Sequence, residues 1–83
     1  MNTRQELSKL LDQALGLDGR AQAFELDTPL MGALPELDSM GVVALLTALE
    51  DRLGLAIDDD EIDASVFETF GTLLQFVQVK LAA

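Results

Sequence analysis

The sequence contains no cysteine, histidine, tyrosine or tryptophan. Without cysteine there is no disulfide, no thiolate metal site and no thiol nucleophile. Without histidine the chain has no imidazole to act as a general base or metal ligand. A hydrolytic enzyme would then need paired carboxylates in a pocket, and no such pair stands apart from the solvated acidic residues. We therefore predict a non-catalytic protein with no catalytic residue, and we assign no metal ligand.

Basic residues are also scarce. Five lysines and arginines face 15 acidic residues, which gives a formal net charge of −10 at pH 7. This charge argues against nucleic-acid partners and anionic membranes and favours partners with basic patches, although solubility alone would also explain it. The longest apolar run, residues 40–46, is too short to span a bilayer, and the polar first residues do not form a secretory signal. We expect a cytoplasmic protein with no stable membrane insertion.

Helical periodicity dominates what is present. The 83 residues are 49% hydrophobic, which suits one small domain with a packed core. Apolar residues recur at helical spacing in three long segments and one short one. We expect an all-α fold: a single domain over residues 1–83 and a monomer. It would be a small four-helix bundle with three long helices, one short helix and a long loop between helices 1 and 2.

The first helix and the connection after it are marked by capping and turn residues. Thr3 and Glu6 have the spacing of a capping box, and Gly16 is placed to end the helix. Residues 17–38 then form a connection rich in turn residues, which is long for so small a domain. Apolar side chains are expected to pin it, with Leu30 and Leu34 inside the bundle and Phe24 or Leu26 over its end.

The segment Ser39–Leu53 organises the rest of the chain. Asp38 and Ser39 both favour a helix start, so either could cap this segment, and Gly54 is placed to end it. If Asp38 caps, the Ser39 hydroxyl is free to point outward, where a phosphate would be favoured by roughly 0.3–1 kcal/mol at the positive end of the helix dipole. On spacing alone, an Asp-Ser pair here is more often a simple cap. The predicted buried face consists of Val42, Leu45, Leu46, Leu49 and Leu53.

Five of the six residues 58–63 are acidic. This run lacks the turn glycine and closing glutamate of an EF-hand, which excludes a calcium loop and leaves only a weak divalent-cation site open. We expect the carboxylates to lie at the N-terminus of a short third helix, Asp59–Ser65, with Ile62 and Val66 facing inward. The last helix is predicted to follow Thr69 as its N-cap. Its buried face would be Phe70, Leu73, Leu74, Val77 and Leu81.

One segment carries a family resemblance. This segment resembles the attachment segment of acyl carrier proteins. It consists of Glu36-Leu37-Asp38-Ser39-Met40, followed by Val43, Leu46, Leu49-Glu50 and Leu53. The similarity continues through residues 57–61 and 67–70. It implies that a phosphopantetheinyl transferase attaches 4′-phosphopantetheine from coenzyme A to Ser39, and that the arm holds acyl groups as thioesters. Asp38 would then be either a contact for the transferase or its magnesium ion, or only the helix cap.

The resemblance also implies partners: an acyl-loading ligase or synthase and acyltransferase enzymes, as in lipid or polyketide biosynthesis. We expect these partners to bind the outward side of the second helix, at Met40, Gly41, Ala44, Thr47, Glu50 and Asp51. The better-known fatty-acid carriers resemble one another in having acidic residues near the first turns, where this chain has Gly41 and Ala44. The surface near Ser39 is therefore predicted to be more apolar. Gly41 would either leave room for the arm or a partner, or be a tolerated change.

Several alternatives remain open at this stage. Residues 36–40 together with 67–73 resemble carriers associated with exosortase and exopolysaccharide gene clusters. An aminoacyl or peptidyl carrier would use the same chemistry with a different cargo. The competing class is a small acidic helical interaction module without a prosthetic group.

Overall fold

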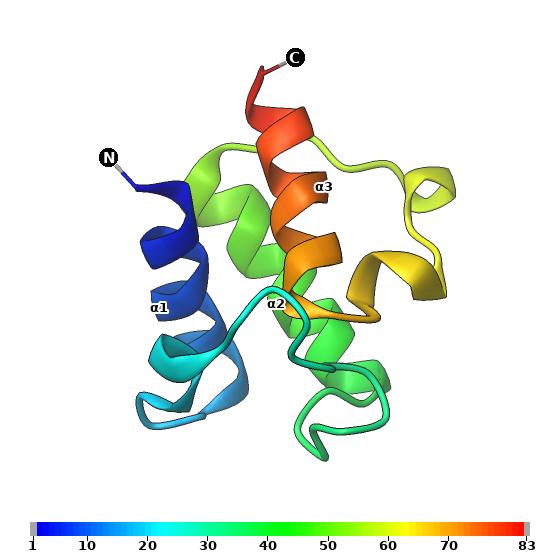
Figure 1. The fold of residues 1–83 in the computed structure, drawn as a ribbon. Coiled ribbons are helices and arrows are strands. Elements are labelled where there is room, and N and C mark those ends of the chain that lie inside the picture. The colour runs from blue at the N-terminus through cyan, green and yellow to red at the C-terminus, as the bar shows by residue number, and fades with distance from the viewer. Residues whose placement is uncertain (1, 83) are drawn as a thin grey trace.

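The computed structural model describes residues 2–82, and within this range the regular secondary structure is helical, with one isolated β-bridge between Pro29 and Thr69. The α-helices are α1 (Thr3–Leu15), α2 (Ser39–Leu53) and α3 (Phe70–Ala82). Three short 3₁₀-helices lie between them: η1 (Arg20–Ala23), η2 (Asp59–Glu61) and η3 (Ala64–Phe67). Helix α1 packs against α2, α3 and η1, and α3 packs against η3 (Figure 1). Within residues 2–82, none of the helices is long and apolar enough to cross a membrane.

The core lies where the three α-helices and the connections meet. It is almost entirely aliphatic, and Phe67 and Phe70 are its largest fully buried side chains. The helical spacing of leucines in α1 and α2 explains this arrangement, because it puts one apolar stripe of each helix toward the others. Fully buried leucines include Leu7, Leu10, Leu11, Leu17, Leu30, Leu45, Leu49 and Leu73.

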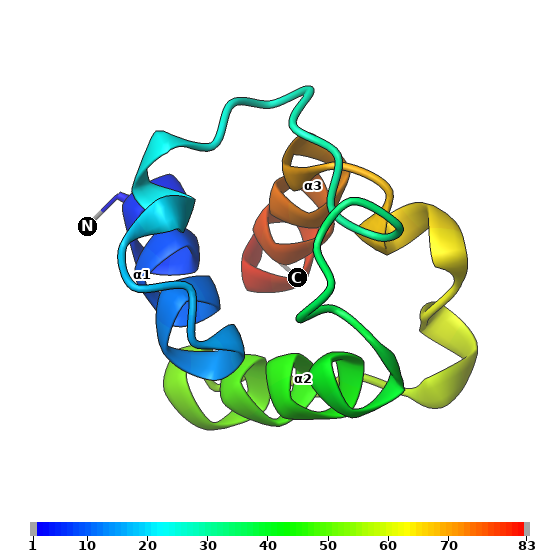
Figure 2. The same ribbon diagram turned by 90° about the horizontal axis from the view of Figure 1, so that it is seen from below.

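The connection between α1 and α2 is pinned by backbone and side-chain contacts, as predicted. Leu30 is fully buried and Leu34 is half-buried, while Phe24 packs edge-to-face on Phe70 with ring centroids 5.9 Å apart. Leu26 is 55% exposed, so Phe24 is the one that covers the bundle. Figure 2 shows the connection running from α1 past the start of α3 and then into α2. Backbone hydrogen bonds join residues 26–31 to residues 67–71 there: Leu30 N to Glu68 O, Met31 N to Phe67 O, Phe70 N to Thr28 O and Gly71 N to Leu26 O, at 2.8–3.0 Å.

The predicted four-helix count is not confirmed, because the short third helix is two separate 3₁₀-helices, η2 and η3. Asp63 lies between them with extended backbone angles (φ −138°, ψ 175°), and its carboxylate accepts from the backbone N–H of Ser65 at 2.9 Å. Asp63 therefore starts a new turn instead of continuing the previous one. The Ser65 hydroxyl also donates to this carboxylate, and that bond, together with the backbone N–H of Ser65, holds the pKa of the Asp63 carboxyl below its usual value. Ile62 and Val66 are half-buried against the core, as predicted.

Two end residues also differ from prediction. The N-cap of α1 is Asn2, whose side-chain oxygen accepts from the backbone N–H of Gln5, so the predicted capping box at Thr3 is wrong. An amide side chain one residue earlier serves the same orphan donors. Leu81 is 44% exposed, because the last turn of α3 extends past the residues that cover its apolar face. The predicted cap at Thr69 is confirmed, since its hydroxyl accepts from Thr72 N at 3.1 Å.

Candidate functional site

Ser39 is the first residue of α2, and its side chain is exposed. The residue before it, Asp38, provides the N-cap. Its carboxylate accepts from Gly41 N at 2.8 Å, and its carbonyl accepts from Val42 N at 2.9 Å. Of the two residues that the sequence offered, Asp38 is therefore the cap. Because Asp38 satisfies the first turn, capping does not occupy the Ser39 hydroxyl.

The helix face around Ser39 is apolar and uncharged. Between Ser39 and Leu49 there is no charged side chain, although the chain as a whole has a net charge of −10. Met40 is 76% exposed and Val43 is 59% exposed, so large apolar side chains stand in solvent one and four residues after Ser39. Scattered apolar residues are ordinary on a protein surface, but two neighbours on one turn beside an exposed hydroxyl form a small continuous patch.

Most of the predicted partner-facing residues lie where the sequence placed them. Met40, Ala44, Thr47, Glu50 and Asp51 are all exposed on α2. The sequence reasoning omitted Val43 from this surface. Val43 lies in sequence between the half-buried Val42 and the buried Leu45, both of which were predicted to face inward. It is three residues from Met40 and therefore on the same helix face.

Gly41 is the exception, because it is buried and not outward-facing as predicted. A Cβ built at this position would overlap the backbone carbonyl oxygen of Glu36 and would lie 3.2 Å from Leu15 Cδ2. The turn before α2 thus folds back onto the helix at residue 41. Helical spacing alone cannot reveal this contact, since the partner atom belongs to the backbone of the preceding turn.

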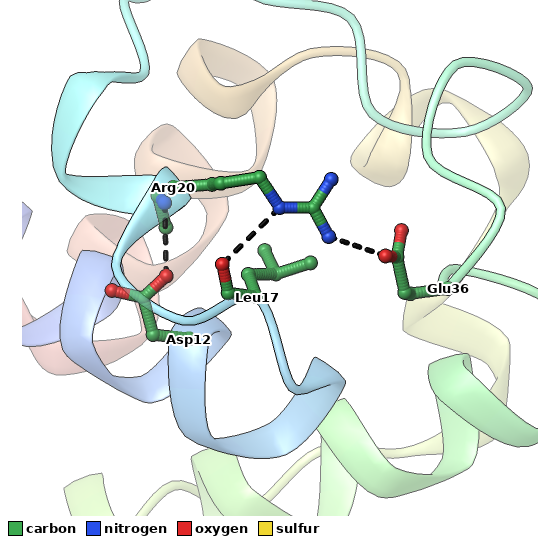
Figure 3. A network of polar contacts seen from close by, with 5 residues as sticks. Asp12, Leu17, Arg20 and Glu36 are labelled. Atoms are coloured by element: carbon green, nitrogen blue, oxygen red, sulfur yellow. Dashed lines mark hydrogen bonds and ion pairs between the residues drawn. The ribbon is translucent and has the colours of Figure 1, made fainter.

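The turn that leads into Ser39 is held by an ion pair from the connection. Arg20 donates to the carboxylate of Glu36, and its Nε also donates to the carbonyl of Leu17 at 3.1 Å (Figure 3). Asp12 fixes η1 behind it by accepting from Ala21 N at 2.9 Å. The hydrogen bond from Arg20 is the main reason that the pKa of the Glu36 carboxyl lies below its usual value. The sequence reasoning missed this pair, which joins residues 16 apart across a loop.

Open grooves lie outside the immediate surroundings of Ser39, and two of them border α2 or α3. One, of about 400 Å³, runs between α1 and α2 and is lined by small and polar residues that include Ala44, Thr47 and Asp51. The other, of about 360 Å³, lies between η3 and α3 beside Val66, Phe76 and Val79. Within the described residues, no group of three or more acidic, histidine or cysteine side chains is arranged to hold a metal ion.

Residues 5–78 match the family model described as the phosphopantetheine attachment site. The chain belongs to the acyl carrier protein family. The holo acyl carrier protein of Nitrosomonas europaea, solved in solution by NMR, is similar to it over 100% of both chains, with 41% identity and a TM-score of 0.89. No protein with a curated description matches this chain.

As a member of this family, the protein is a non-catalytic carrier and a substrate of a phosphopantetheinyl transferase, and its cofactor is covalently attached 4′-phosphopantetheine. The residues at the start of α2 fit such a group. An exposed hydroxyl provides an attachment atom, and the N-terminus of a 15-residue helix favours the phosphodiester that attachment would leave. The absence of cysteine is consistent with this arrangement, because the thiol comes from the prosthetic group.

Proposed function

We propose that Ser39 is the attachment residue, and that this chain holds acyl intermediates as thioesters and presents them to partner enzymes. The observation that carries the proposal is that capping and exposure of a hydroxyl fall on two different residues at the start of α2. Asp38 caps the helix, and the neighbouring Ser39 hydroxyl stands exposed at the positive end of the helix dipole.

The chemistry of loading requires only one nucleophilic atom from this chain. The Ser39 oxygen attacks phosphorus in the pyrophosphate of coenzyme A. An O–P bond forms, the P–O bond to adenosine 3′,5′-bisphosphate breaks, and the serine proton passes to a base on the transferase. The chain has no histidine to act as that base, and Asp38 is engaged with Gly41 N. The attached group then supplies the thiol that carries the acyl cargo.

We also propose that partners bind the outward face of α2. Near Ser39 this face presents Met40 and Val43, followed by Ala44 and Thr47, and only at its far end the acidic Glu50 and Asp51. A complementary partner has apolar side chains beside the transferred group and basic side chains about three helical turns away. An acyl-loading ligase or synthase and an acyltransferase are the partner classes that the carrier role requires.

The finer assignments stay predictions. An aminoacyl or peptidyl carrier would use the same Ser39 chemistry with a different cargo, and the similarity to a holo acyl carrier protein favours acyl cargo. The exosortase-associated subtype, the monomeric state, the single domain over residues 1–83 and the cytoplasmic location remain as stated from the sequence. Family membership favours a carrier over an interaction module without a prosthetic group.

Intact-mass measurement after incubation with coenzyme A and a promiscuous transferase tests the proposal. The parent chain should gain one phosphopantetheine. Ser39→Ala should gain none, whereas the control Ser65→Ala, which removes another exposed hydroxyl, should be loaded like the parent. An unmodified parent chain would instead support the interaction module, and loading of Ser39→Ala would place the attachment elsewhere.

A further inference from the structure

The turn from Glu36 to Asp38 is held from two sides just before Ser39. From the connection, Arg20 binds the Glu36 side chain and is itself anchored on the carbonyl of Leu17. From α2, the Glu36 carbonyl lies against Gly41 so closely that a side chain at 41 would overlap it. Between these two holds, Leu37 is buried, and its N–H donates to the carbonyl of Leu34 at 3.0 Å.

We propose that Gly41 is a positioning residue for loading of the prosthetic group, with the Arg20–Glu36 ion pair as its counterpart on the other side of the turn. This inference rests on the proposed attachment at Ser39. Neither residue touches the reacting atoms. Together they fix the turn, and the turn fixes the Asp38 cap and the outward direction of the Ser39 hydroxyl.

The identity of residue 41 follows from this packing. Inside a helix, alanine is intrinsically more stable than glycine, so an open position would gain stability from Gly→Ala. At residue 41 the obstacle to a Cβ is a backbone carbonyl, which cannot swing away as a flexible side chain can. Accommodating the methyl group therefore requires the Glu36–Asp38 turn or the first turn of α2 to shift. Either shift moves the Ser39 hydroxyl relative to its cap.

The Glu36 side chain shows how the turn also depends on Arg20, on the side of the connection. One of its carboxylate oxygens is bound by Arg20, and the other, Oε1, is buried with no hydrogen-bond partner within residues 2–82. Without Arg20 the carboxylate would lose its ion pair. Hydration would then favour a rotation of the Glu36 side chain toward water, because an unpaired buried carboxylate is costly. The turn would then lose its side-chain hold from the connection and keep only the packing of Leu37 and the contact with Gly41.

Gly71 provides a matched control variant. It also lies in the first turn of a helix, and a Cβ there would lie 2.6 Å from the carbonyl oxygen of Leu26. The two glycines thus make the same kind of contact, but Gly71 belongs to α3 and touches a part of the connection that does not lead directly into Ser39. Both Gly→Ala changes should lower the melting temperature, contrary to helix propensity.

The test is the transferase kinetics of the full chain at a temperature well below every melting transition, with circular dichroism to verify folding. Gly41→Ala should lower kcat/KM for loading about tenfold or more, because small misplacement of a reacting group is costly. Gly71→Ala should keep the parent kcat/KM. The protection factor of the residue-41 amide, which donates to Asp38 in the parent chain, should also fall in the first variant only.

A parent-like kcat/KM for folded Gly41→Ala, or an equal loss in Gly71→Ala, would overturn the inference while leaving attachment at Ser39 intact. Failure of the parent chain to load would instead reject the proposed function. If Gly41→Ala does not fold, Arg20→Gln decides: its kcat/KM should fall about threefold relative to Arg52→Gln, an exposed control on α2. Equal kinetics for those two variants would overturn the inference.

Discussion

At the scale of single residues, the start of α2 separates two tasks that one side chain could have performed. Asp38 makes the capping hydrogen bond, and Ser39 is left in solvent. A serine that capped the helix itself would keep its oxygen bound to the first turn, and loading would break that bond. Placing the acidic residue first therefore allows chemistry at the hydroxyl without a loss of helix stability.

Stability measurements on the two residues test this separation. Asp38→Ala should lower the free energy of unfolding by about 1 kcal/mol, the usual worth of an N-cap. Ser39→Ala should lower it by less than about half of that value, because no cap is lost. Urea unfolding of the unloaded chain measures both. A loss well above about 1 kcal/mol in Ser39→Ala would show that serine, not Asp38, carries the cap.

At the scale of elements, the segment between α2 and α3 differs most from a regular helix. Its two 3₁₀-helices are short, and side chains hold the first of them in place. The carboxylate of Glu61 accepts from Asp58 N at 2.8 Å and pairs with Lys80 Nζ of α3 at 2.8 and 3.0 Å. The ion pair ties η2 to the last turn of α3, where a cation also suits the helix dipole.

The Lys80–Glu61 pair predicts a pH-dependent contribution to stability. The hydrogen bond from Lys80 is the main cause that lowers the pKa of Glu61 from its ordinary value of 4.5. Since the folded-state pKa is depressed, the pair's contribution is present above the unfolded-state value and disappears as the pH falls through the lower, folded-state value. Lys80→Met should thus lower the melting temperature at pH 7 and much less at pH 3.

The control for that experiment is Lys9→Met, which removes the same charge from an exposed position of α1 that makes no ion pair within the described residues. Its effect on the melting temperature should be smaller at pH 7. Thermal unfolding by circular dichroism between pH 3 and pH 7 gives both curves. An equal loss for Lys80→Met at the two pH values would mean that the pair does not stabilise the fold.

At the scale of the whole molecule, the net charge of −10 is spread over only 83 residues. The densest acidic run is residues 58–63, in the segment with the shortest helices, while α2 has no charged side chain from Ser39 to Leu49. Like charges repel more strongly in the compact state than in the expanded chain. Repulsion among the carboxylates therefore lowers the stability of the folded state.

Salt should consequently stabilise this protein. Raising NaCl from about 10 mM to about 0.3 M shortens the screening length from roughly 30 Å to well below 10 Å. We expect the melting temperature to rise by about 5 °C, which corresponds to about 1 kcal/mol for a domain of this size. A double variant, Asp58→Asn with Asp60→Asn, should melt higher at low salt and respond less. A melting temperature that does not change with salt would exclude repulsion as a limit on stability.

The sequence by itself determined the features that depend on local spacing and on single residue types. The apolar repeat of α2, its start at the Asp38-Ser39 pair and its Gly54 end follow from residues within one or two helical turns of one another, so their positions agree with the structure. The same local chemistry gave the Thr69 cap and the family resemblance around Ser39. Burial of Leu30 followed from the need to pin a long connection.

Only the tertiary structure decided the features that depend on residues far apart in the chain or on backbone packing. Gly41 is buried because the turn before α2 folds back onto it, and the Arg20–Glu36 pair forms because η1 lies beside that turn. The acidic run became two 3₁₀-helices because Asp63 takes an extended conformation and caps the second. The periodicity of apolar residues predicts which face of a helix is buried. It does not predict which backbone segment elsewhere in the chain packs against that face.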